Sequence, residues 1–304
     1  MIGYFDPRRL HTGDHPDIAS TQGALAMIYE DLGRYDEARE TMHASIEMLV
    51  RLFGERHPAV GYNRYGFGRI LVSCGQKAEA EQAYLSALEI LSETLGPSHT
   101  MIADVSIGLA NLYRGQGDWQ EAERLLDRAE GIVVQSLGRE SQLYGMVLGS
   151  RAWLQYQQGQ FDNAEATARQ ALELRRKLVG DEGFAYGASL SALAAILGRQ
   201  GRTDESLEAF AQAIGILETT GGSGAGRLVE CRYNYGRVLI QVQRYDDAED
   251  QLLHALQGLE ANRGFDPGKR VDILDALIEL YDVCGNDDRL ADVRALRAAT
   301  STQR

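Results

Sequence analysis

Cysteine, proline, lysine and long apolar runs are all scarce in this 304-residue chain. The three cysteines, Cys74, Cys231 and Cys284, are an odd number without CxxC spacing, which argues against a disulfide framework and against a zinc site. We expect them to be buried thiols in a reducing compartment. No run of about 18 apolar residues is present, so the sequence predicts no membrane-spanning helix. The opening MIGYFDPRRLHTGDH lacks the apolar core of a secretory signal, which favours a cytoplasmic location.

Positive charge is also in short supply. The chain has 31 Lys and Arg against 44 Asp and Glu, and its net charge is −13. The basic residues are scattered, so the electrostatic footprint of a nucleic-acid or anionic-membrane partner is missing, and a neutral or basic protein partner fits better. Only three of the 31 basic residues are lysines, a bias typical of a GC-rich, bacterial coding genome. Apolar residues make up 44% of the chain, which is normal for a folded protein.

Glycine, by contrast, recurs at a fixed interval. The segment GQGDWQEAERLL, residues 115–126, is similar to three others, LGRYDEARETM, QGQFDNAEATA and VQRYDDAEDQL. Aligning the segments gives one series of positions 42 residues apart, and a second series keeps the same step out of phase with the first. The first series is Gly33, Gly75, Gly117, Gly159, Gly201, Gln243 and Gly285, and the second is Gly54, Gly96, Gly138, Gly180, Gly222 and Gly264. Two series at one period predict two turns per repeat.

Segments with helical periodicity lie between the turns, and fixed slots in them hold fixed types of side chain. In the first segment of each repeat the large slot holds Ile28, Ile70, Leu112, Leu154, Ile196, Val238 and Leu280, and the small slot holds Ala26, Gly68, Ala110, Ala152, Ala194, Gly236 and Ile278. In the second segment two small slots lie seven residues apart: Ala38, Ala80, Ala122, Ala164, Ser206 and Ala248, then Ser45, Ala87, Ala129, Ala171, Ala213 and Ala255. A seven-residue step returns to one helix face, so these slots predict a close-packed contact line.

All five prolines respect the predicted boundaries. Pro16, Pro58 and Pro267 lie where a first helix should begin, Pro97 lies in the turn before one, and Pro7 precedes the array. Proline inside a helix costs about 3 kcal/mol but is tolerated in the first turn, so this placement supports the assignment of helices.

Each repeat is therefore a helix hairpin that must stack on its neighbours to bury its apolar face. The sequence predicts an all-α superhelix, an α-solenoid of about seven hairpins, with a lead of residues 1–13 before a single solenoid over residues 14–304. The expected repeats are 14–54, 55–96, 97–138, 139–180, 181–222, 223–264 and 265–304. The segment GGSGAG, residues 221–226, lacks the Gly-Lys-Ser/Thr ending of a phosphate loop and predicts a hinge between the first five repeats and the last two.

These features resemble the tetratricopeptide repeats, in the 42-residue form found in kinesin light chains and many bacterial proteins. The similarity is closest over residues 95–138, where Tyr113 follows the small slot by three residues and Trp119 follows the turn glycine. A Gly-x-x-His-Pro junction appears at Gly54 to Pro58. The resemblance implies binding of proteins or peptides along a concave surface lined by the first helices. Asparagines on that surface hold a peptide backbone in kinesin light chains. Of the seven matching slots in this chain only that of Asn234 keeps the asparagine, and the others hold Ala, Gly or Ser, which departs from that pattern.

Side chains that vary between repeats fall on the predicted concave face. They include several Tyr, Trp, Met and Arg residues, the types in which protein interfaces are enriched. The candidate binding residues are Tyr62, Tyr65, Arg69, Asn111, Arg114, Met146, Trp153, Tyr156, Tyr233, Asn234 and Arg237. The last repeat instead offers Asp272, Asp275, Glu279 and Asp282. The alternative is that neighbouring helices or a terminal segment cover the aromatic rings.

No catalytic, metal or cofactor site is predicted. His15, His57 and His99 lie 42 residues apart, but equivalent positions of neighbouring repeats are separated by about 10 Å, too far to share one metal ion. They are expected to cap or join the hairpins. No Ser/His/Asp or Cys/His arrangement stands apart from the repeat pattern, so we expect no enzyme.

The sequence thus predicts a non-catalytic recognition module that binds a protein or peptide and serves as a scaffold. The alternative is a sensor or regulatory region of a larger signalling protein with a kinase, nucleotide-binding or peptidase domain, in which ligand binding changes the curvature of the superhelix. The polar last helix, NDDRLADVRALRAATSTQR, disfavours self-assembly through the end repeats, so we expect a monomer.

Overall fold

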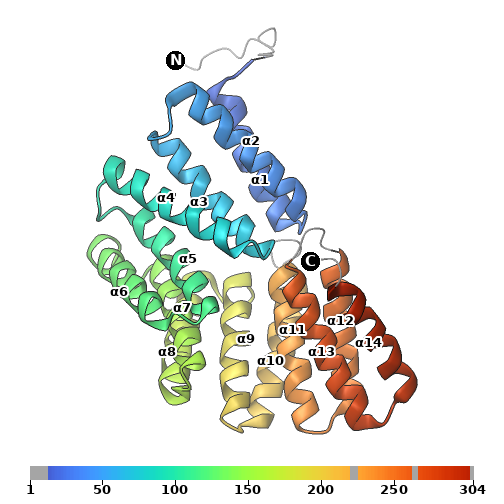
Figure 1. Cartoon of the computed structure of the whole chain (residues 1–304). Coiled ribbons are helices and arrows are strands. Elements are labelled where there is room, and N and C mark those ends of the chain that lie inside the picture. The colour runs from blue at the N-terminus through green and yellow to red at the C-terminus, as the bar shows by residue number, and fades with distance from the viewer. Residues whose placement is uncertain (1–12, 220–224, 262–265, 302–304) are drawn as a thin grey trace.

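Fourteen α-helices follow one another along the residues that the structure describes (Figure 1). The structure, a computed structural model, describes residues 13–219, 225–261 and 266–301. No strand occurs in these three ranges, which confirms the predicted all-α class. Residues 221–224 of the predicted hinge lie outside them, and residues 225 and 226 begin a helix. None of the helices in these ranges is long and apolar enough to cross a membrane.

The helices pair into seven hairpins, as the repeat predicts. The first helices of the pairs are α1 (Pro16–Asp31), α3 (Pro58–Ser73), α5 (Thr100–Gln116), α7 (Gln142–Gln157), α9 (Phe184–Arg199), α11 (Ala225–Gln241) and α13 (Pro267–Cys284). The second helices are α2 (Tyr35–Phe53), α4 (Lys77–Leu95), α6 (Trp119–Ser136), α8 (Phe161–Val179), α10 (Thr203–Thr219), α12 (Tyr245–Ala261) and α14 (Asp287–Ser301). Each second helix also packs against the first helix of the next pair, so the hairpins stack in chain order.

The turns keep one backbone geometry throughout the array. Ten glycines of the two series adopt positive φ values between 65° and 89°, a region that glycine enters without a steric penalty because it has no Cβ. Gln243 interrupts the first series and still adopts a φ of 60°, the one positive value recorded for a residue other than glycine in the described ranges. The repeat therefore imposes its turn even where the sequence lacks the glycine.

The three repeated histidines are helix N-caps. In each of them Nδ1 accepts a hydrogen bond from the backbone N–H two residues later, at Asp17, Ala59 and Met101, over 3.2 Å. The capping role predicted for His15, His57 and His99 is confirmed. Such a bond satisfies one of the N–H groups that a helix start leaves without an internal partner.

The small slots of the second helices and the large slot of the first helices form the core, with one exception. The small slots of the second helices are at most 1% exposed from repeat to repeat, and the large slot of the first helices is buried in repeats two to seven. Ile28, which fills the large slot in repeat one, is 53% exposed, so the prediction that it is a core residue is wrong. The equivalent Ile70 is covered because α2 lies against α3, whereas no helix among the described residues precedes α1.

The prediction of three buried thiols is also wrong. Cys231 is buried, Cys74 is partly buried and Cys284 is exposed. Cys284 is the last residue of α13, in the final hairpin of the described chain, where no further repeat packs against it.

The curvature of the solenoid brings its two ends together. Figure 1 shows the hairpins following a curved path that returns the first repeats to the start of α13. There the backbone N–H of Asp266 donates to the carbonyl of Ser73 over 2.8 Å. Burial raises the pKa of Tyr35 on α2 to about 12, and Glu230 of α11 is one of the carboxylates that add to the shift. Repeats one and two therefore lie beside repeats six and seven.

Candidate binding groove

The first helices line the inner side of the curve. Each odd-numbered helix packs against the next odd-numbered helix, from α1 to α13, so these helices form the more closely spaced side of the superhelix. Ion pairs between neighbouring first helices mark the same side. Arg69 Nη2 lies 3.1 Å from a carboxylate oxygen of Glu30, and Arg237 Nη2 lies 3.6 Å from one of Glu279. Of the predicted groove residues, Arg69 and Arg237 thus lie on the inner helix faces.

Two of the predicted apolar groove residues are well exposed on this side. Tyr62 is 39% exposed and Met146 is 40% exposed. Trp153, one helical heptad after Met146, is partly buried, and its ring meets Tyr156 edge-on with centroids 5.2 Å apart. Tyr156 in turn lies 5.8 Å from Phe161, the first residue of α8. A row of rings therefore leads from the inner side of α7 to the hairpin turn.

The other two tyrosines contribute more to packing. Tyr65 packs against the core around α4 and α5, and its ring centroid lies 6.0 Å from that of Tyr84. Burial raises the pKa of Tyr65 to about 12, and the carboxylate of Asp104 adds to the shift. Tyr233 packs against the last core cluster, and its hydroxyl accepts a hydrogen bond from Arg237 over 3.4 Å.

Asn111 and Arg114 link α5 to α7. The Asn111 amide donates to Ser150 Oγ over 3.0 Å, which joins two neighbouring first helices. With the amide of Gln157 oriented to satisfy both of its atoms, the Gln157 oxygen accepts from Arg114 Nη1 at 3.1 Å, and its nitrogen donates to the Arg114 carbonyl at 3.2 Å. Arg114 Nε is buried and has no hydrogen-bond partner in the described part of the chain. Asn234, a partly buried residue of α11, forms no such link within the ranges that the structure describes.

Arg175 is a residue of this region that sequence reasoning missed, because it lies on a second helix. Its guanidinium reaches from α8 between α7 and α9, where it donates to the carbonyl of Ala185 at 2.8 Å, to that of Gly145 at 3.3 Å and to the hydroxyl of Ser189. A Cβ on Gly149 would lie 3.5 Å from Arg175 Nη2. The signal in the sequence was the pair of glycines in α7, which leave room for this side chain.

Arg114 of α5 and Arg175 of α8 are both affected by the charge of Arg227 on α11. Burial, reinforced by the charge of Arg227, lowers the pKa of Arg175 to about 10, so the group is still charged at pH 7. Burial also lowers the pKa of Arg114, while Glu230 opposes the shift and Arg227 adds to it. Glu230 forms ion pairs with Arg227 at 2.9 Å and Lys269 at 3.3 Å. No carboxylate pairs with Arg114 or Arg175 among the described residues.

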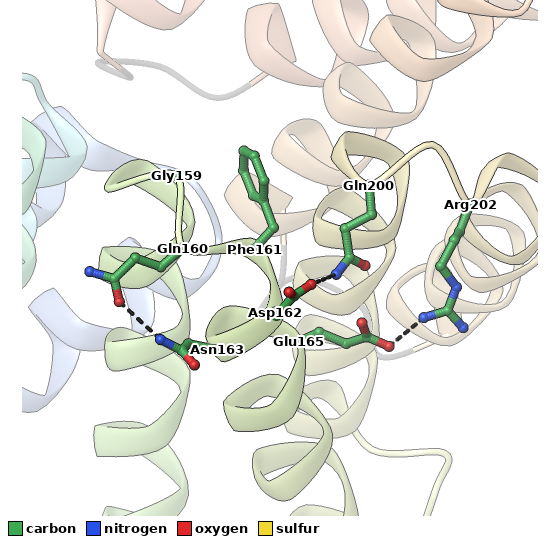
Figure 2. A pocket seen from close by; sticks show the side chains of 8 residues that line it. All are labelled: Gly159, Gln160, Phe161, Asp162, Asn163, Glu165, Gln200 and Arg202. Carbon is green, nitrogen blue, oxygen red and sulfur yellow. Dashed lines mark hydrogen bonds and ion pairs between the residues drawn. The ribbon is translucent and has the colours of Figure 1, made fainter.

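A separate hollow lies at the turn edge of repeats four and five (Figure 2). It has a volume of about 720 Å³ and is lined by Gly159, Gln160, Phe161, Asp162, Asn163, Glu165, Gln200 and Arg202. Its polar groups bind one another: Gln200 donates to Asp162 over 3.1 Å, and Arg202 pairs with Glu165 at 2.5 Å. These contacts join two repeats. Within the described ranges no cluster of His, Cys, Asp or Glu is arranged to hold a metal ion.

Comparison with known families agrees with this architecture. The sequence profile of the tetratricopeptide repeat matches residues 17–93, 67–132, 100–177 and 186–261, which together span most of the chain. The fold defines an α-solenoid of hairpin repeats. The chain belongs to the tetratricopeptide repeat family, whose members are generally non-catalytic scaffolds for protein interactions. A search of the curated proteins finds no match.

Solved structures show the same fold. One is a crystal structure from Podosopora anserina, described as nearly identical TPR-like repeats of a kinesin light chain. Its sequence is 24% identical to this chain, the TM-score is 0.52, and the match covers 67% of this chain and 97% of that one. The crystal structure of BtubC (BKLC) from P. vanneervenii is 20% identical, with a TM-score of 0.53, and the match covers 82% of this chain and 94% of that one. The predicted similarity to kinesin-light-chain-type repeats is confirmed.

Proposed function

We propose that this chain is a non-catalytic module that binds a peptide segment of a partner protein in the inner groove. The observation that carries the proposal is that Tyr62 and Met146 remain 39% and 40% exposed on the inner side, although stacking needs neither of them. Large apolar side chains beside arginines are typical of the residues that dominate binding at protein interfaces.

The charges of the groove suggest which peptide it takes. Arg114 and Arg175 are held by neutral groups, so no carboxylate of the described residues pairs with either charge. In a chain whose net charge is −13 this group of cations stands out, and on this ground we propose an acidic peptide, whereas the net charge alone favours a neutral or basic partner. A peptide with an acidic residue close to an aromatic or aliphatic one complements both features. Arginine binds carboxylates through two parallel hydrogen bonds, which adds geometric selectivity.

The chain is proposed to act as one solenoid over residues 14–304 and as a monomer. The three free cysteines are typical of proteins in a reducing compartment, and we place the module in the cytoplasm on that ground.

Selection from a displayed library of random peptides tests the proposal. Peptides that the full chain retains should contain an acidic and an aromatic residue, and their affinity should fall about tenfold or more for Arg175→Met and for Tyr62→Ala. Arg176→Met is the matched control, since the side chain of this neighbour on α8 forms no hydrogen bond or ion pair with the described residues of α7 or α9. Peptides that bind all three variants as well as the parent chain would place the site elsewhere.

A second function, a sensor whose curvature changes on binding, is favoured by one observation. The hydrogen bond from Asp266 to Ser73 holds repeats two and seven together, so a ligand that widens the groove must break it. X-ray scattering separates the two functions. A selected peptide that leaves the radius of gyration unchanged supports a rigid module, and one that increases it supports the sensor.

A further inference from the structure

The outward face of α1 is apolar, and no other helix of the described ranges covers it. Leu25 and Ile28 are 38% and 53% exposed, and Leu32, at the end of the helix, is 52% exposed. Their spacing puts them on one side of the helix, opposite Ala19, Gly23 and Ala26, which are buried. The surface lies at the end of the solenoid, away from the groove, and it does not depend on the proposed function.

The other repeats show what covers an equivalent face. In α3 the corresponding slots hold Phe67, Ile70 and Cys74, and Ile70 is fully buried in one cluster with Ala38 and Met42 of α2. Every first helix after α1 packs in this way against the second helix of the preceding hairpin. The face of α1 is therefore shaped to receive a helix of the second-helix type.

A hydroxyl group specifies one residue of that helix. Tyr113 OH donates to Glu81 Oε1 over 2.9 Å, and Tyr281 OH donates to Glu249 Oε1 over 2.6 Å. In both cases the glutamate lies on the second helix of the preceding hairpin. Tyr29 occupies the same slot in α1, where Arg34 lies 4.5 Å over its ring, and no hydrogen bond of its hydroxyl is found within the described part of the chain.

We propose that the outward face of α1 binds an amphipathic helix of a partner protein, seated as a second helix sits on the following first helix. The helix presents small residues seven positions apart to Leu25 and Ile28, and a glutamate that accepts a hydrogen bond from Tyr29. This chemistry, small residues seven positions apart and a glutamate beside the first of them, is what α4 and α12 supply inside the array.

The last helix of a second copy does not meet these requirements. In α14 the glutamate slot is Ala291, and the slots of Met42 and Ser45 are Arg294 and Arg297. Arg297 pairs with Asp275 at 2.7 Å and Arg294 with Asp282 at 3.5 Å, so both are already engaged in their own hairpin. If two copies of the chain stacked head to tail, Arg294 and Arg297 of one copy would lie against Ile28 of the other. The occupant is therefore a different helix.

Synthetic peptides test the proposal on the full chain. The probe is a labelled peptide of residues 245–261, which carries Ala248, Ala255 and Glu249 in the required register, and the negative control is residues 287–301. The first peptide should bind and the second should not. Ile28→Glu should weaken binding about tenfold or more, and because that side chain is exposed it should leave the melting temperature unchanged. Tyr29→Phe and the peptide change Glu249→Gln should each weaken binding about fivefold, with no further loss when combined.

Three outcomes would overturn the proposal. Binding that Ile28→Glu does not affect means that the peptide has exchanged with α12 in its own hairpin. A dimer of the full chain that Ile28→Glu dissociates, seen by sedimentation, means that a second copy covers the face. Stronger peptide binding after deletion of residues 1–12, with a lower melting temperature, means that this segment is the natural cover.

Discussion

Asp266 donates its backbone N–H to the carbonyl of Ser73 over 2.8 Å and so ties the start of the last hairpin to the end of α3. The approach is close because residue 75 is a glycine. A Cβ there would lie 2.5 Å from Asp266 Oδ1. The contact depends on a long stretch of superhelix between the two residues, so its existence reports on the curvature of every repeat in between.

Gly75→Ala is expected to open this contact. The new methyl group collides with the Asp266 carboxylate, so the ends should separate and the radius of gyration measured by X-ray scattering should increase. The residue also has a φ of 77°, which costs an alanine about 1–2 kcal/mol. Gly159→Ala is the matched control, since its φ is 76° and a Cβ there meets nothing within 4 Å. Equal radii for the two variants would show that the contact does not hold the ends together.

Gln243→Gly is expected to stabilise the protein. Gln243 adopts a φ of 60° in a turn where the other repeats have glycine, and a side chain in this region costs about 1–2 kcal/mol. Glycine removes that cost but loses more backbone entropy on folding, so a net gain of about 0.5–1 kcal/mol is expected from chemical unfolding. The reverse change, Gly201→Gln, should lose a similar amount. A Gln243→Gly variant less stable than the parent would mean that the glutamine side chain makes up for its strain.

The repeat made most of this fold predictable, and the places where prediction failed lie where the repeat ends or folds back. The residues equivalent to Ile28 are buried in the six other repeats, as predicted. A position in the repeat does not reveal, however, whether a neighbouring helix is present to cover the side chain. Arg175 was missed because periodicity assigns a second-helix residue to the outer side, and only its length lets it reach between α7 and α9. The contact of Asp266 with Ser73 depends on the summed curvature of several repeats, which no local pattern encodes.

The pH dependence of stability should reveal the pair formed by Glu30 and Arg69. Burial raises the pKa of Glu30 above 4.5, Arg69 opposes the shift, and Asp31 adds to it. Because the pKa of Glu30 is higher in the folded than in the unfolded chain, protonation of Glu30 stabilises the folded state. This stabilisation is fully present below the unfolded pKa and is lost as the pH rises through the folded pKa.

Arg69→Met removes the opposing charge, so the pKa of Glu30 should rise further. Compared with the parent chain, the variant should lose about 1 kcal/mol or more at pH 7, and the loss should shrink towards about pH 4.5. Titration of the Glu30 carboxyl carbon by NMR measures the pKa directly. In a chain that carries Glu30→Gln, the loss of stability caused by Arg69→Met should depend less on pH. A lower pKa of Glu30 in Arg69→Met would contradict the pairing.

The groove should separate residues that bind from residues that fold. Tyr62 and Met146 are exposed, so Tyr62→Ala and Met146→Ala should change the free energy of unfolding by no more than about 0.5 kcal/mol. If Tyr62 and Met146 anchor a partner, each substitution should weaken the binding of a peptide selected with the full chain by about 2 kcal/mol. Leu112 is 4% exposed, and Leu112→Ala should cost about 2–5 kcal/mol of stability through the cavity it leaves.

Trp153 is the intermediate case, because its ring packs against the α9–α10 core and also meets Tyr156. Trp153→Ala should therefore lower both stability and affinity, whereas Trp153→Phe keeps an aromatic ring and should recover most of the stability. Calorimetric titration beside thermal unfolding, for the same set of variants, distinguishes the two effects. If Trp153→Phe recovers stability and affinity together while Tyr62→Ala and Met146→Ala bind like the parent chain, the ring belongs to the core and the binding surface lies elsewhere.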